Sequence, residues 1–259
     1  MAKKPADRKA VIDDIRRKQK AAEKRSSYAI VGVCVTVAVL IIAAAAYRPV
    51  KDWWSLREFK GLDLSSIGAP ASVCGDRVFR VPTGASASGT DGSHVPEGAE
   101  VDYEFAPPVF GPHWNVGGVA PVPMDRKFYT AEDRPPLEAL VHNSEHGYAI
   151  LWYDETIADD ADALTEVRAL AQKFPGTSNL RYKFKAVPWL STDEDGAAFP
   201  DGMHVALTHW AANDVVGFDD RKEGEQTGIW QYCSEVSGDA LKQFMIDYDY
   251  LNSPEPNAM

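Results

Sequence analysis

The sequence predicts a single α+β domain that follows one N-terminal transmembrane helix. Residues 29–46 form an apolar stretch without a charged side chain, long enough to cross a bilayer. In the rest of the chain, strand-like segments predominate and two helical patterns are set apart instead of alternating with strands. We therefore expect a mainly antiparallel or mixed sheet, two main helices and long loops rich in proline and glycine.

The apolar stretch of 18 residues has two interpretations. As a helix it would cover about 27 Å, close to a hydrocarbon core of about 30 Å, with Tyr28 and Tyr47 at the two interfaces. A cleavable secretory signal is the alternative, with residues 43–46 as its small-residue cleavage site. Because such a signal has an apolar region of only about 7 to 15 residues, the length favours an uncleaved signal anchor.

The segment before the apolar stretch is basic, whereas the remainder of the chain after it is acidic. Residues 1–27 carry 10 basic and 4 acidic side chains, although the whole chain has a net charge of −11. The basic bias predicts a cytoplasmic N-terminus and an extracytoplasmic remainder in the cell membrane. We interpret the basic segment as a topology signal that also contacts the lipid bilayer. The acidic remainder argues against nucleic-acid binding.

Four segments are expected along the chain. They are a cytoplasmic basic segment at 1–27, the anchor at 28–47, a juxtamembrane segment and domain start at 48–81, and the main exported domain at 82–259. The juxtamembrane segment contains Trp53 and Trp54, which suit either a short helix on the membrane surface or a stalk packed on the domain. The pattern does not choose between them.

The elements of the exported domain follow from local patterns. Alternating or continuous apolar residues predict strands at 99–105, 148–153, 180–187 and 204–210. Helical spacing predicts helices at 161–174, capped by Asp159 and Asp160, and at 239–248. Residues 82–98 are rich in Gly, Ser and Thr, and the prolines and glycines of 107–123, with Gly117 and Gly118, exclude regular structure; both are expected loops.

The chain has three cysteines, one in the apolar stretch and two after it. Cys34 lies in the apolar stretch, whereas Cys74 and Cys233 are the cysteines of the exported part. Since conditions outside the membrane permit disulfides, we expect these two to pair. A thiolate zinc pair is the weaker alternative, because such ligands are normally closely spaced in sequence.

The histidines carry the strongest chemical signal. His142 and His146 are four residues apart, so their imidazoles can share a metal ion if the backbone between them makes a helical turn or tight loop, but not if it is extended. A metal site thus predicts a turn at Asn143 and Ser144. With Glu145 between them, the letters H-x-x-E-H also match an inverted zinc-protease motif, although Pro135 and Pro136 leave little room for the helix that motif needs.

Longer motifs resemble a bacterial family. They are His-Val ahead of a Val-x-Tyr segment, Pro-Pro-x-x-Gly-Pro-His, and Val-His-x-x-Glu-His-Gly, within residues 94–256. This stretch is similar to the family catalogued as domain of unknown function 3105. Departures are Phe110, Ala120 and the pair Asn143–Ser144. The resemblance implies a single anchor, an exported domain, and motif residues at His94, His113, His142, Glu145 and His146.

Our leading hypothesis is an extracytoplasmic protein whose His94, His113, His142 and His146 bind copper or zinc. Second-shell or alternative ligands are Glu145, Met124, His204 and His209, although the last two also suit hydrogen-bonded residues of a strand. Metal handling or assembly beside a membrane respiratory complex such as an oxidase would link anchor and site. The alternatives are a metal-free accessory subunit of a membrane complex and a hydrolase with Glu145 as base. No catalytic residue is assigned.

Overall fold

The computed structural model describes residues 5–116, 120–219 and 222–258. The chain divides into two compact units, Met1–Ser55 and Leu56–Met259, which are described separately. The first four residues of the expected basic segment, Gly117 and Gly118 of the expected loop, and the last residue of the expected domain lie outside the described residues.

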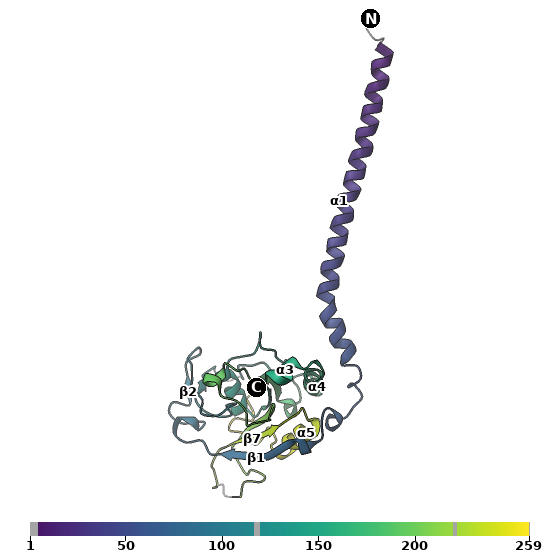
Figure 1. The fold of residues 1–259 in the computed structure, drawn as a ribbon. Coiled ribbons are helices and arrows are strands. Elements are labelled where there is room, and N and C mark those ends of the chain that lie inside the picture. The colour runs from purple at the N-terminus through teal and green to yellow at the C-terminus, as the bar shows by residue number, and fades with distance from the viewer. Residues whose placement is uncertain (1–4, 117–119, 220–221, 259) are drawn as a thin grey trace. The chain divides into compact units, whose positions relative to one another are not determined.

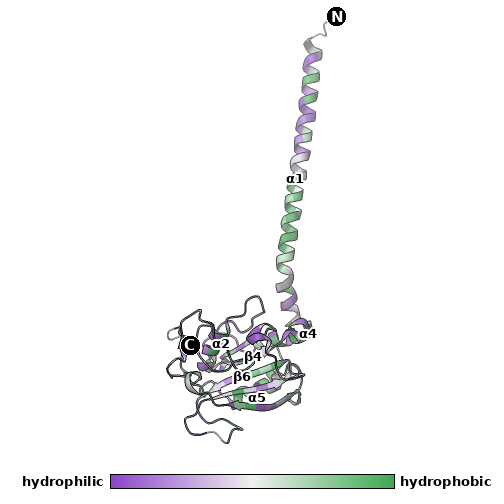
Figure 2. Cartoon of the chain, turned by 60° about the vertical axis from the view of Figure 1, so that its left-hand side comes forward, coloured by the Kyte–Doolittle hydropathy of each residue, from purple (hydrophilic) through white to green (hydrophobic). Residues whose placement is uncertain are grey.

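The first unit is a long helix, α1 (Pro5–Ser55), with Pro49 inside it. Figure 2 shows hydrophilic residues toward its N-terminal end and a continuous hydrophobic central part. The side chains of this part are exposed, and by length and composition the helix can cross a membrane. A secretion signal near an N-terminus meets the same criteria of length and composition.

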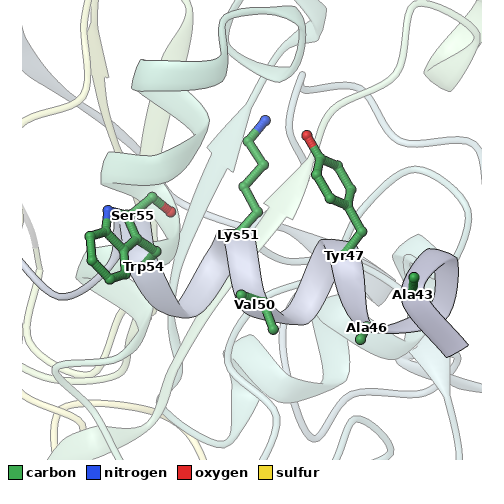
Figure 3. A pocket seen from close by; sticks show the side chains of 7 residues that line it. All are labelled: Ala43, Ala46, Tyr47, Val50, Lys51, Trp54 and Ser55. Atoms are coloured by element: carbon green, nitrogen blue, oxygen red, sulfur yellow. The ribbon is translucent and has the colours of Figure 1, made fainter.

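The C-terminal end of α1 carries exposed aromatic and aliphatic side chains. The residues on the face shown in Figure 3 are Ala43, Ala46, Tyr47, Val50, Lys51, Trp54 and Ser55. All of them belong to α1, and one helix encloses no cavity, so we interpret this face as a surface and not as a binding pocket. Tyr47, Lys51 and Trp54 are residue types that suit a membrane–water interface. Helix α1 includes the first residues of the expected juxtamembrane segment.

The second unit is built on a five-stranded mixed sheet with the strand order β1-β7-β6-β4-β5 (Figure 1). The strands are β1 (Cys74–Arg80), β4 (Ala149–Tyr153), β5 (Phe184–Pro188), β6 (Val205–Ala211) and β7 (Thr227–Cys233). Neighbouring strands are antiparallel except for β4 and β5, which are parallel. The predicted α+β class and mixed sheet are therefore confirmed.

Both faces of the sheet are buried. Alternate residues of a strand point to opposite faces, and every residue of β4 is buried. Leu151 and Tyr153 of β4 join a core cluster with residues of the helices α4 (Ala161–Ala171) and α5 (Gly238–Asp247). Ile150 and Trp152 of the same strand join a second cluster with Leu140 of helix α2 (Leu137–Glu145). Helix α2 therefore covers the face opposite to α4 and α5.

The expected helices at 161–174 and 239–248 are confirmed as α4 and α5. Asp160 caps α4, where its carboxylate accepts hydrogen bonds from the backbone N–H groups of Asp162 and Ala163. Ser237 caps α5 through Ala240. A short helix, α3 (Glu155–Asp159), precedes α4 and is capped by Asp154. The 3-10 turns are Leu64–Ser66, Ala71–Val73, Gly84–Ser86, Leu180–Tyr182 and Asp193–Gly196.

The disulfide joins Cys74 to Cys233, in agreement with the expected pairing. The two residues face each other where β1 meets β7, so the bond ties an edge strand to the sheet. It links positions 159 residues apart. Closing so long a loop removes about 4 to 5 kcal/mol of conformational freedom from the unfolded chain in the entropic model.

The expected strand at 99–105 is wrong. The backbone N–H of Val101 donates to the carboxylate of Glu138, and that of Tyr103 donates to Glu194, so side chains take the place of a neighbouring strand. The expected strand at 180–187 is partly wrong, since its first residues form a 3-10 turn and β5 begins at Phe184. The strands expected at 148–153 and 204–210 are confirmed as β4 and β6.

Candidate metal centre

Helix α2 places three site residues on one side. The turn expected at Asn143 and Ser144 is helical, so Glu145 and His146 lie three and four residues after His142, on the same side of the helix. The side chain of Asn143 accepts from the N–H of Val122 at 3.0 Å and donates to its carbonyl at 2.9 Å, which fastens a loop to the helix. Helix α2 is therefore held by the loop above it and by the sheet below.

Two further histidines come from a small parallel sheet of β2 (His94–Val95) and β3 (His113–Trp114). His94 is the register partner of His113, and the backbone N–H of His113 donates to the carbonyl of Ser93 at 2.9 Å. The two rings lie 4.8 Å apart between centroids. This pairing brings together two loops that the sequence only marks as irregular.

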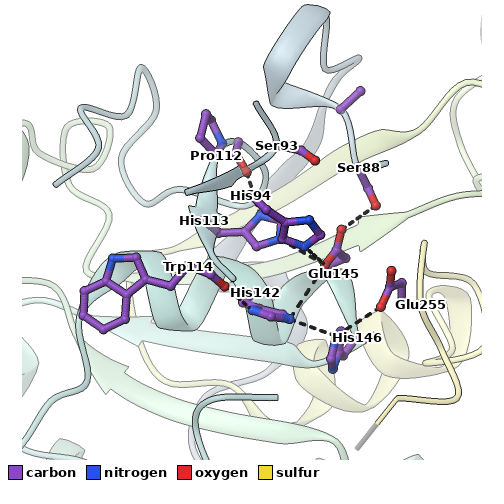
Figure 4. Close-up of polar contacts among 12 residues, drawn as sticks. Ser88, Ser93, His94, Pro112, His113, Trp114, His142, Glu145, His146 and Glu255 are labelled. Carbon is purple, nitrogen blue, oxygen red and sulfur yellow. Dashed lines mark hydrogen bonds and ion pairs between the residues drawn. The ribbon is translucent and has the colours of Figure 1, made fainter. Parts of the chain in front are cut away.

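The four residues His94, His113, His142 and Glu145 converge on one point (Figure 4). From Oε2 of Glu145, the Nε2 atoms of His113, His94 and His142 lie at 3.0, 3.7 and 3.9 Å. A tetrahedral ion with bonds of about 2.1 Å holds its ligand atoms about 3.4 Å apart, so these separations suit one shared ion. His94 remains 35% exposed whereas the other three are buried, which leaves an approach from solvent.

Carbonyl groups orient two of the imidazoles. Nδ1 of His113 lies 2.8 Å from the carbonyl oxygen of Gly111, and Nδ1 of His142 lies 2.6 Å from that of Trp114. A carbonyl only accepts, so each Nδ1 carries the hydrogen and each neutral ring keeps its lone pair on Nε2. Metal-bound histidines are usually fixed in this way by an acceptor behind the ring.

The electrostatics of the centre keep Glu145 ionised. Burial alone would raise its pKa, but His113 and a hydrogen bond donated by the Ser88 hydroxyl outweigh it and lower the pKa to about 2. Burial lowers the pKa of His142, with the charge of His113 as a further cause. Burial and then the charge of His142 lower the pKa of His146 to about 4. The anionic carboxylate of Glu145 and the lowered pKa values of His142 and His146 are the protonation preferences that metal binding requires.

The predicted ligands fall into two places. His94, His113 and His142 form the group of four with Glu145, which was expected only as a second-shell or alternative ligand. His146 lies beside this group, with its Nε2 atom 3.1 Å from that of His142.

The remaining candidates, Met124, His204 and His209, do not belong to this group of four. Met124 packs in the core cluster of helix α2, and His209 is buried with its Nε2 donating to the carbonyl of Asn252. His204 pairs with Asp154 at 2.8 Å. These contacts agree with the structural interpretation of the two histidines in the strand.

Sequence reasoning did not assign a role to Ser88 or Glu255. Ser88 donates to Oε1 of Glu145 from the loop at 82–98, whose composition indicates only a loop. Glu255 lies 3.4 Å from His146, between Oε2 and Nε2. Glu255 and His146 lie far apart in the chain, so no local pattern in the sequence links them.

The fold and the cluster define a class: an α+β domain with a buried His/Glu group able to bind a metal ion, preceded by a helix able to cross a membrane. The family profile described as "Protein of unknown function (DUF3105)" matches residues 94–259, and the chain belongs to this family. The match includes all four residues of the cluster, whereas Ser88, which donates to Glu145, lies before it. No curated protein and no solved structure matches the chain.

Proposed function

We propose that the domain binds copper or zinc through His94, His113, His142 and Glu145. The observation that carries this proposal is the contact between His113 and Glu145. Nδ1 of His113 donates to a carbonyl, so its Nε2 lone pair faces a carboxylate oxygen at 3.0 Å. Two acceptors this close need a positive group between them. A proton would satisfy this pair, whereas a metal ion would also bind Nε2 of His142, which otherwise contacts Nε2 of His146 at 3.1 Å.

Three imidazoles and one carboxylate favour a transition metal. Imidazole suits zinc and copper, while calcium and magnesium prefer oxygen ligands. Copper(II) has the highest affinity among the common divalent ions for a given set of ligands, and zinc favours the tetrahedral arrangement. The supply of each metal in the cell compartment then decides which ion is bound.

The setting supports metal handling outside the cytoplasm. A disulfide indicates an oxidising compartment, and the basic segment before the apolar helix favours a cytoplasmic N-terminus. We propose a membrane-anchored protein that holds copper or zinc for a membrane complex such as a respiratory oxidase. Protease added to intact cells should remove the domain; protection of the domain would contradict this orientation.

Metal content tests the proposal. The full chain is purified in detergent without a histidine tag, and copper and zinc are measured by elemental mass spectrometry, as isolated and after incubation with each ion. The His113→Ala/His142→Ala variant should lose the metal. The His204→Ala variant is the matched control and should keep it, because His204 lies outside the cluster.

The result separates the proposal from the other hypotheses. Metal bound by the parent chain and lost in the folded double variant would support it. A parent chain that binds neither ion would contradict it and leave the metal-free accessory subunit as the better hypothesis. Any hydrolytic activity that survives Glu145→Gln would exclude Glu145 as its base.

A further inference from the structure

A second group of donors adjoins the first. Glu145, His146 and Glu255 offer ligand atoms that lie within 4.8 Å of one another, and Glu145 alone belongs to both groups. His146 ends helix α2 and Glu255 comes from the C-terminal tail, on the side of Glu145 away from His94 in Figure 4. The second group is therefore continuous with the first through one carboxylate.

The tail is fixed beside helix α2 by several hydrogen bonds. The backbone N–H of Glu255 donates to the carbonyl of Glu145 at 3.0 Å. The buried ammonium of Lys183 donates to the carbonyl of His146 at 2.7 Å and to those of Pro256 and Ala258 at 2.8 and 2.7 Å. These contacts hold the Glu255 carboxylate next to the imidazole of His146.

The geometry of His146 suits a ligand. Its Nε2 atom lies 3.4 Å from Oε2 of Glu255, which equals the separation of about 3.4 Å expected for two ligand atoms on one tetrahedral ion. The imidazole is 1% exposed, and its Nδ1 atom has no hydrogen-bond partner among the described residues. A cation at this position would bind Nε2, which lies 3.4 Å from the Glu255 carboxylate and 3.1 Å from Nε2 of His142, and it would replace the contact between the two imidazoles.

We propose that His146, Glu255 and Glu145 form a second subsite for a divalent cation, with Glu145 bridging two ions. This inference rests on the proposed function, because the first ion occupies the other side of Glu145. In proteins that hold two ions in one centre, the ions are about 3.5 to 4 Å apart. A bridging carboxylate fits this spacing.

The two subsites differ in access. The first has four protein ligands, three of them buried, whereas the second has three, and the side chain of Glu255 is 50% exposed. A site with three protein ligands leaves a coordination position for water or an exchangeable ligand. The second subsite therefore binds its ion more weakly and exchanges it more rapidly than the first. Its ligand from the C-terminal tail is Glu255.

The experiment is a stoichiometric titration with Zn²⁺ alone. The metal-stripped full chain in detergent is incubated with increasing Zn²⁺, separated from free metal by gel filtration and analysed by elemental mass spectrometry. The variants are Glu255→Gln, which changes only a half-exposed side chain, and His146→Gln. The matched controls are Glu235→Gln, an exposed carboxylate, and His204→Gln, an imidazole outside both groups.

We expect about two ions per parent chain and per control, and about one ion per chain for Glu255→Gln and His146→Gln. A parent chain that binds a single ion, or a Glu255→Gln variant that still binds two, would overturn the second subsite and leave the first intact. A parent chain that binds no Zn²⁺ at all, and no copper in the earlier test, would overturn the proposed function itself. The two failures are thus distinguishable.

Magnetic coupling gives a second readout of the bridge. With Cu²⁺ as the probe, two ions that share Glu145 should show the coupled electron paramagnetic resonance spectrum of a copper pair in the parent chain. Glu255→Gln should give the spectrum of an isolated ion. An uncoupled spectrum from a parent chain loaded with two ions would overturn the bridging role of Glu145.

Discussion

Nε2 of His113 lies 3.0 Å from Oε2 of Glu145, although 32 positions separate these residues in the sequence. His113 belongs to a two-residue strand and Glu145 to the last turn of helix α2. Both side chains are fully buried, so this contact is protected from water and is stronger than an equivalent surface pair. It forms the centre of the metal site proposed above.

The first prediction concerns this contact. His113→Gln should weaken zinc and copper binding by more than the roughly 10- to 100-fold that follows loss of an outer partner, because it removes a ligand. Competition with a metal-binding dye measures the affinity, and circular dichroism verifies the fold. His204→Gln is the control. Unchanged affinity in a folded His113→Gln chain would exclude His113 from the site.

The second prediction concerns Ser88, which donates to the other oxygen of Glu145. Ser88→Ala should lower metal affinity by roughly 10- to 100-fold while leaving all ligands in place, because the hydroxyl orients the carboxylate. Ser86→Ala in the same loop is the control and should have little effect. If both variants bound metal equally well, Ser88 would have no positioning role.

The third prediction uses Gly147, which follows His146 with a φ of +87°. A Cβ atom there would lie 2.3 Å from the carbonyl oxygen of Tyr250. Gly147→Ala should therefore lower the free energy of unfolding by more than Gly176→Ala does. Gly176 has a φ of +74° but open space around it. For Gly176→Ala we expect a loss of stability of about 1 to 2 kcal/mol, from backbone strain alone. Denaturant unfolding measures both, and equal losses would show that the tail moves away freely.

The fourth prediction is an acid-dependent loss of stability. Burial lowers the pKa of His209 from 6.5 to about 4, so the unfolded chain binds a proton that the folded chain does not. The contribution of His209 to the free energy of unfolding is complete above about pH 6.5. It is lost as the pH falls toward 4, by up to about 3 kcal/mol.

Denaturant unfolding of the full chain in detergent, followed by tryptophan fluorescence between about pH 7 and pH 4.5, tests this loss. His209→Gln keeps a neutral hydrogen-bond donor and should reduce the dependence on pH. A parent chain and variant with the same dependence would show that other groups cause it.

The fifth prediction concerns the disulfide. The Cys74→Ser/Cys233→Ser variant should lose about 4 to 5 kcal/mol of stability in the entropic model, because the unfolded chain regains the freedom of a long loop. Cys34→Ser is the control, since Cys34 is a free cysteine in helix α1. Thermal or denaturant unfolding of the full chain in detergent measures the change. Equal stability of variant and parent would contradict this estimate.

Local sequence patterns were sufficient where neighbours along the chain decide the structure. The helices α4 and α5 follow from apolar spacing, and the start of α4 also follows from Asp160. The strand β4 follows from its continuous apolar run. The segment at 99–105 has the alternation of a strand, but alternation cannot reveal that Glu138 and Glu194 take up its backbone N–H groups.

The sequence by itself determined the apolar helix, the division of charge, the α+β class and the residue types available for a metal. Its motifs also indicated His94, His113 and His142. Only the tertiary structure decided that Glu145 joins them, that Ser88 orients it, and that Glu255 reaches His146. The physical reason is that these donors come from segments far apart in the chain. Their proximity depends on the pairing of β2 with β3 and on long-range hydrogen bonds to α2, which no local periodicity encodes.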